Sequence, residues 1–161
     1  SVSATSTILC LEDGGFRIDH DWRLDANWRT LSATVAKHNA SGRQTLRLDR
    51  SSAGWLVDGY LRPDLSSAEE PDLSVTPFCN TFPIRRVAEA GGSSLTLDVA
   101  FIDAGTMDVS LSRQTYLRKG PGRLRFVAHG RFEGFEADLT VDDEGVIVTY
   151  EHLFEQLAPQ S

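Results

Sequence analysis

The residues whose chemistry stands out in this sequence are two adjacent arginines, Arg85 and Arg86. They follow an apolar stretch marked by Pro77 and Pro83 rather than lying in a charged loop. A guanidinium that points into a protein must be paired, because an unpaired buried charge is costly. Its partner is either a carboxylate of the protein, such as Asp72, or the polar head group of a ligand. The arginine pair therefore predicts either a structural ion pair or a head-group contact.

Motifs of catalysis and metal binding are missing from the sequence. It contains no nucleophile elbow, HExxH motif, P-loop or dinucleotide fingerprint. In the densest ligand cluster, residues 19–21, the two carboxylates of a strand would point away from His20, so one metal could not take all three. The acidic residues 142–145 lack the alternating ligands of a calcium loop and indicate a polar hairpin turn. We therefore predict no catalytic residue, no metal and no cofactor.

The charge of the chain limits its partners. The formal net charge is −7, which disfavours phosphate backbones and anionic membrane surfaces, so we expect no nucleic-acid partner and no stable membrane insertion. No run approaches the roughly 20 apolar residues that cross a bilayer. The N-terminal residues lack the pattern of a secretory signal, which predicts a cytoplasmic location unless a signal preceded Ser1. The two cysteines, Cys10 and Cys79, are expected to be reduced and buried.

The pattern of apolar residues predicts the elements that must position these groups. Period-two alternation dominates and indicates about ten strands joined by Gly-rich and Asp-rich turns. One candidate strand covers residues 28–36. Residues 61–71 contain prolines and are expected to form a surface loop. A short helix is expected to begin near Thr76 or Thr81, and a second at residues 151–157. The prediction is one domain, residues 1–161, built as a β roll, barrel or sandwich.

Large aromatic side chains are candidates for a pocket wall. Trp and Tyr combine an apolar body with a polar tip, which suits amphiphiles and sugars. Each of them is also an ordinary core residue, and the sequence leaves both interpretations open. The candidates are Trp28, Trp55, Tyr60, Tyr116, Phe126 and Phe135.

Two segments resemble a known bacterial family. Residues 55–59 read W-L-V-D-G, and residues 72–87 read D-L-S-V-T-P-F-C-N-T-F-P-I-R-R-V. This pattern is similar to the signature of the bacterial glycolipid-binding family, first described as a domain of unknown function. Phe82 and Val87 replace the commoner leucines and keep the pattern apolar. Residues 24–30, 114–116 and 141–150 also fit, so the resemblance covers nearly the whole chain.

The resemblance implies a fold and a site. The implied fold is mostly β: a strongly curved antiparallel sheet, either a spiral β-roll or a half-barrel, with one or two short helices. The implied role is binding of a glycolipid or similar amphiphile in the groove of that sheet, and the family supplies no catalytic residue. The ligand-binding residues that we predict from their side-chain chemistry are Trp28, Trp55, Asn80, Arg85, Arg86, Gln114, Tyr116 and Phe126.

Three functions remain open at this stage. The favoured one is non-catalytic binding of a lipid-like ligand, with a concave wall formed by Trp28, Trp55, Leu97, Val99 and Phe126. The alternative of a small hydrolase or isomerase acting on a hydrophobic or sugar-linked substrate requires a titratable group in the pocket. Asp58, Asp72, Asp98 and His129 could supply it. A protein-interaction module is the third, and it would need a large exposed apolar patch.

Overall fold

The computed structural model describes residues 1–158, which form thirteen strands and one α-helix, with three short 3-10 helices. The chain divides into two compact units. The first unit contains Ser1–Thr76 and Val99–Leu111, and the second contains Pro77–Asp98 and Ser112–Ser161. The assignment of residues 1–161 to one domain stays a prediction.

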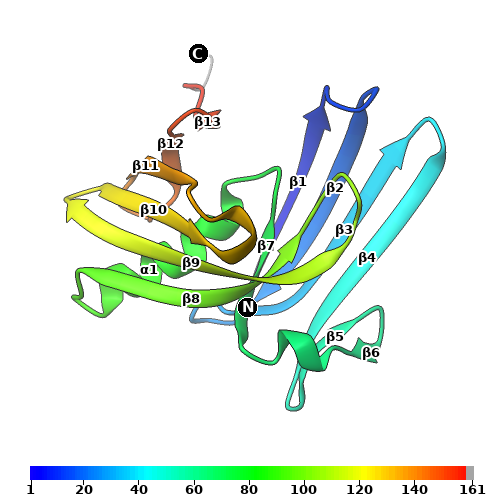
Figure 1. Ribbon diagram of the computed structural model, residues 1–161, viewed down its shortest axis with the longest axis horizontal. Coiled ribbons are helices and arrows are strands. Elements are labelled where there is room, and N and C mark those ends of the chain that lie inside the picture. The colour runs from blue at the N-terminus through cyan, green and yellow to red at the C-terminus, as the bar shows by residue number, and fades with distance from the viewer. Residues whose placement is uncertain (159–161) are drawn as a thin grey trace. The chain divides into compact units, whose positions relative to one another are not determined.

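A six-stranded antiparallel sheet belongs to the first unit. Its strands follow the order of the sequence from β1 to β6 (Figure 1). Strand β2 shows why these residues form a sheet, because Ile18, His20 and Trp22 are buried, whereas Asp21 between them and Arg23 after them are exposed. The strands are β1 (Val2–Cys10), β2 (Phe16–Leu24), β3 (Thr30–Asn39), β4 (Gly42–Ser51), β5 (Gly54–Val57) and β6 (Tyr60–Leu61).

A seven-stranded sheet has the order β13-β12-β11-β10-β9-β8-β7 and curls strongly into a half-barrel. The predicted class, a mostly β protein with a strongly curved antiparallel sheet, is therefore confirmed. Strands β8 and β9 contribute residues to both units. The strands are β7 (Ala68–Leu73), β8 (Ser94–Ile102), β9 (Val109–Gly120), β10 (Arg123–His129), β11 (Glu136–Val141), β12 (Ile147–Tyr150) and β13 (Phe154–Glu155).

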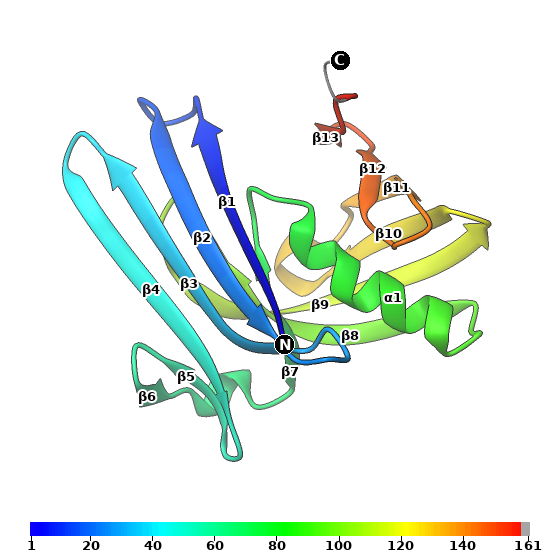
Figure 2. The same ribbon diagram turned by 180° about the vertical axis from the view of Figure 1, so that it is seen from behind.

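The helix α1 (Thr81–Glu89) lies against one face of the strands of the second unit (Figure 2). Its buried side chains include Phe82, Ile84 and Val87, of which Ile84 and Val87, three positions apart, share one side of the helix. The prediction of a short helix here is confirmed. Thr81 is the first helical residue and Asn80 occupies the N-cap without a side-chain hydrogen bond to the backbone. Pro83 is tolerated because the first turn has no intrahelical N–H partners to lose.

Three local predictions were wrong. Residues 61–71 are not a loop, since they contain a 3-10 helix (Pro63–Leu65) and most of β7. Pro71 fits in β7 because that strand is the last of the seven in order, and a proline is tolerated at a sheet edge. Residues 151–157 form a turn and the short strand β13 instead of a helix. The strand expected at residues 28–36 begins at Thr30, because Trp28 lies in the preceding turn with φ 60°.

The first unit buries an ion pair where β7 meets the first sheet. Glu70 is 1% exposed, accepts the Thr30 N–H at 3.0 Å and lies 3.4 Å from the Arg50 guanidinium. Arg50 also packs on the Trp55 ring, 4.5 Å from its centre. A buried carboxylate needs such partners, since its desolvation is otherwise uncompensated. These contacts hold Trp55 and β7 in place.

Candidate binding cavity

The sequence of β9 places a row of polar side chains on the buried face of the second unit. Ser112, Gln114 and Tyr116 are 7%, 4% and 0% exposed, respectively, whereas Arg113 between them is exposed. Period-two alternation produces this division, because successive side chains of a strand point to opposite faces. Buried polar groups require hydrogen-bond partners.

A short chain of hydrogen bonds supplies those partners. The Asn80 side-chain amide donates to the Tyr116 hydroxyl at 2.7 Å, and that hydroxyl donates to Gln114 Oε1 at 3.2 Å. Asn80 comes from the 3-10 helix Phe78–Asn80, directly before α1. The chain of bonds therefore ties the start of the helix to the middle of β9. A satisfied buried network of this kind makes the surrounding structure rigid.

Aromatic rings extend this buried face across the next strands. The Phe126 ring lies 5.4 Å from Tyr116, 5.9 Å from Tyr150 and 6.0 Å from Phe135, measured between ring centres. The small Ala137 is paired directly opposite Phe126 on β11, which leaves room for rings from neighbouring positions. All three pairs are edge-on or tilted, as the ring quadrupoles favour. Tyr116, Phe126 and Tyr150 are buried and form an aromatic part of the core of the second unit, whereas Phe135 is 37% exposed.

A cavity of about 410 Å³ opens beside α1 in the second unit. Its apolar floor comes from Ile84 and Val87 of the helix, Leu124 of β10 and Val141 of β11. Three segments border it: the second half of α1, the β9–β10 turn at Gly120–Gly122, and the β11–β12 turn at residues 142–145. The charged residues around the cavity are Arg85, Glu89, Arg118, Asp142, Asp143 and Glu144.

The β11–β12 turn is fastened to α1 at the edge of this cavity. The Arg85 guanidinium donates to the backbone carbonyl of Glu144 at 2.8 Å and lies 3.8 Å from its carboxylate. Gly145 follows with φ 79°, and a Cβ there would lie 3.2 Å from Arg85 Cγ. The turn itself is closed by Asp142, whose Oδ1 accepts the N–H groups of Glu144 and Val146. Residues 142–145 thus form the predicted polar hairpin turn.

The structure separates the predicted binding residues into groups. It brings Asn80, Gln114, Tyr116 and Phe126 together on the buried face of the second unit, and it places Arg85 beside the cavity. Arg86 is half-buried on α1 and does not border the cavity.

Trp28 and Trp55 belong to the first unit. Trp55 is 2% exposed and donates its indole N–H to the Ala68 carbonyl at 2.9 Å. Trp28 is half-buried in the β2–β3 turn. The wall expected from Trp28, Trp55, Leu97, Val99 and Phe126 is therefore drawn from both units. A ligand-binding role for any of these residues stays a prediction.

Sequence reasoning missed the residues that form the floor of the cavity. Ile84 and Val87 are three positions apart, which places them on one side of a helix, and this spacing was the available signal. Leu124 and Val141 carried no comparable signal, since alternating apolar residues occur in every strand. The acidic turn at 142–145 was recognised as a turn but not as the border of a cavity.

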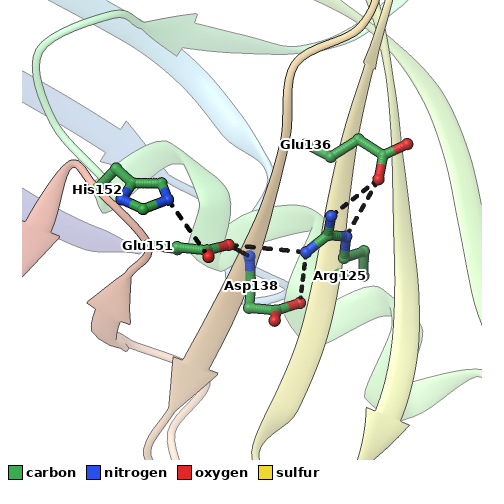
Figure 3. A network of polar contacts seen from close by, with 5 residues as sticks. All are labelled: Arg125, Glu136, Asp138, Glu151 and His152. Carbon is green, nitrogen blue, oxygen red and sulfur yellow. Dashed lines mark hydrogen bonds and ion pairs between the residues drawn. The ribbon is translucent and has the colours of Figure 1, made fainter.

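The opposite face of the second unit carries a charged network on β10, β11 and the end of β12. Arg125 contacts three carboxylates, with distances of 2.9 Å to Glu136, 2.9 Å to Asp138 and 3.6 Å to Glu151 (Figure 3). His152 lies 3.4 Å from Glu151. Hydrogen bonds to Asp138 and Glu136 raise the pKa of Arg125, so it stays charged. This charged network joins neighbouring strands.

Candidate titratable groups for catalysis take part in similar strand contacts. Asp98 accepts from Arg113 at 2.8 Å, and His129 is hydrogen-bonded to Thr115 at 2.8 Å. In the first unit, Asp58 accepts the Arg47 N–H at 2.8 Å. Asp98 and His129 do not border the cavity of the second unit. These contacts give no support to a catalytic role for the three residues.

Among residues 1–158, no three His, Cys, Asp or Glu side chains are grouped so that they could hold a metal ion. No helix in this part of the chain has the length and apolar character needed to cross a membrane.

The curled antiparallel sheet and the helix beside it define a β-sheet protein with a helix-bordered cavity. The sequence model of one family, described as "Putative glycolipid-binding", matches residues 1–156, and the chain belongs to this family. The crystal structure of a DUF1089 family protein from Pseudomonas aeruginosa is similar, with a TM-score of 0.83 and 27% sequence identity over 98% of this chain and 94% of that chain. None of the curated proteins matches the chain.

Proposed function

We propose that this protein binds a glycolipid-like amphiphile without catalysis, and that the apolar end of the ligand enters the cavity beside α1. The cavity carries the proposal, because it combines an apolar floor of Ile84, Val87 and Leu124 with a charged rim. Its volume of about 410 Å³ lies within the roughly 300–1,000 Å³ of small-molecule sites. The family description supports the same class of ligand.

The expected affinity follows from the length of apolar chain that the cavity takes up. Each buried methylene contributes about 0.8 kcal/mol, so roughly eight methylenes give about 6 kcal/mol before the cost of association. Since that cost is at least about 4 kcal/mol, contacts of the head group with the rim must supply the rest. Binding in the micromolar to millimolar range is therefore expected for a simple amphiphile.

A larger side chain at the border can fill the cavity without disturbing the core. Ala88 borders the cavity and is exposed on α1, so Ala88→Trp should occupy part of the space and leave the fold intact. Ala90 is also exposed, lies just past the end of the helix and does not border the cavity, which makes Ala90→Trp a matched control. Dodecyl maltoside, below its micelle concentration, is titrated into each protein by calorimetry.

We expect Ala88→Trp to weaken the binding of dodecyl maltoside by about tenfold or more and Ala90→Trp to leave it unchanged. Native mass spectrometry of the purified protein, with lipid extraction, is expected to show a co-purifying species that Ala88→Trp reduces. Equal affinities of both variants, or a wild-type protein that binds no amphiphile, would show that the cavity is not the site.

A further inference from the structure

Negative side chains outnumber positive side chains around the cavity. Four carboxylates border it, on Glu89, Asp142, Asp143 and Glu144, against the two guanidinium groups of Arg85 and Arg118. The four carboxylates lie on the helix end and on the β11–β12 turn, so they approach the cavity from two sides. An anion that enters therefore meets more negative than positive charge.

Arg85 and Glu144 largely offset each other's charge at the border of the cavity. The Arg85 guanidinium donates to the Glu144 carbonyl at 2.8 Å and lies 3.8 Å from the Glu144 carboxylate. An ion pair contributes little net charge, so the sign of the potential depends on the other charged groups at the border. These are three carboxylates, on Glu89, Asp142 and Asp143, against the single guanidinium of Arg118.

The orientation of α1 makes the electrostatic potential at the cavity more negative still. The residues of the helix that border the cavity, from Ile84 to Glu89, form its C-terminal half. Carbonyl groups at the C-terminal end of a helix carry a partial negative charge. The whole chain is also acidic, with a net charge of −7, so the long-range field repels anions as well.

We propose that the cavity selects amphiphiles with an uncharged, hydroxyl-bearing head group and rejects anionic heads such as phosphates. This inference rests on the proposed function and specifies its ligand class. Carboxylates accept strong, charge-assisted hydrogen bonds from hydroxyl groups, and Arg118, which also lines the cavity, can donate to a ring or glycosidic oxygen. A polyol uses both kinds of group, whereas a quaternary ammonium head is attracted to the carboxylates but has no N–H or O–H to donate to them.

Three dodecyl amphiphiles with different heads test the selection: dodecyl maltoside, dodecyl phosphate and dodecyltrimethylammonium. Each is titrated calorimetrically into the wild-type protein below its micelle concentration, at low and at moderate salt. We expect the maltoside to bind at least about tenfold more tightly than the phosphate at low salt. The difference between the two affinities should become smaller as salt screens the carboxylates.

Reversing charges at the border of the cavity tests whether these charges cause the preference for the maltoside over the phosphate. Glu89 and Asp143 are exposed at the border, so the double variant Glu89→Lys/Asp143→Lys should raise the affinity for dodecyl phosphate by about tenfold and weaken that for the maltoside, which loses two hydrogen-bond acceptors. The control Glu133→Lys/Glu155→Lys changes the net charge equally at exposed positions of the same unit that do not border the cavity. This control variant should change the affinity for dodecyl phosphate much less.

Each contrary result is informative. Tighter binding of the phosphate or of the ammonium amphiphile by the wild-type protein would overturn the selection while leaving amphiphile binding in place. An equal response in the control variant would show that net charge, rather than the rim, decides the preference, and would also overturn it. Failure of all three amphiphiles to bind would overturn the proposed function itself.

Discussion

Gly122, in the β9–β10 turn at the border of the cavity, offers a sharp test of the local packing. Its φ is 63°, and a Cβ at this position would lie 2.9 Å from the backbone carbonyl of Val141. Gly122→Ala therefore combines the strain of a left-handed residue, about 1–2 kcal/mol, with a clash against backbone that should add about 1–3 kcal/mol. The expected loss in the free energy of unfolding is about 2–5 kcal/mol.

Gly134 is the matched control for this prediction. It lies in the same unit with φ 92°, and a Cβ there would meet nothing within 4 Å. Gly134→Ala should therefore cost only the conformational strain, about 1–2 kcal/mol. Urea unfolding monitored by circular dichroism gives both values. Equal losses in the two variants would refute the close approach of Gly122 to Val141.

Further predictions concern buried and charged groups. Burial lowers the pKa of His20, so the unfolded chain takes up the proton first as pH falls below about 6.5, and stability should fall there. His20→Leu should flatten this part of the stability profile. Tyr116→Phe removes the hydroxyl that Asn80 donates to and should cost about 1–3 kcal/mol in urea unfolding, and a double-mutant cycle with Asn80→Ala should give a coupling of about 1 kcal/mol. Arg125→Gln leaves Glu136, Asp138 and Glu151 without their shared guanidinium, so the loss in the free energy of unfolding should be larger at low salt than at high salt, which screens exposed charges. A salt-independent effect of Arg125→Gln would contradict the network.

The class of fold could be predicted from the sequence because period-two alternation reports directly on strands. The alternation at β2, β9 and β10 follows the buried face of each strand, and the turns at residues 14–15 and 142–145 carry the Gly and Asp residues that such turns require. The position of α1 was also foreseen, since prolines exclude a central strand and one of them sits in the first turn of the helix.

The errors arose where tertiary context overrode a local signal. Pro71 marked a loop by composition, yet β7 accepts it at the edge of the sheet. Trp28 looked like the start of a strand because it is large and apolar, but it occupies a left-handed turn position. The segment at residues 151–157 was too short for helical periodicity to be distinguished from a turn.

The candidate site was only partly predictable for a related reason. A cavity is formed by segments that are distant in sequence, here α1, the β9–β10 turn and the β11–β12 turn. The arginine motif indicated Arg85, but its contact with the Glu144 carbonyl depends on the folding of a turn 59 positions away. No pattern within either segment contains that contact.

The most direct test of amphiphile binding is an NMR titration of the isotope-labelled protein with dodecyl maltoside, in which the shifts of backbone amides and side-chain methyl groups are followed. The account predicts that the largest saturable changes occur at Ile84, Val87, Leu124 and Val141, with smaller ones at Gly145 and Asp143. Saturable changes centred on other residues, or no change at all, would contradict the claim that this cavity receives the apolar end of the ligand.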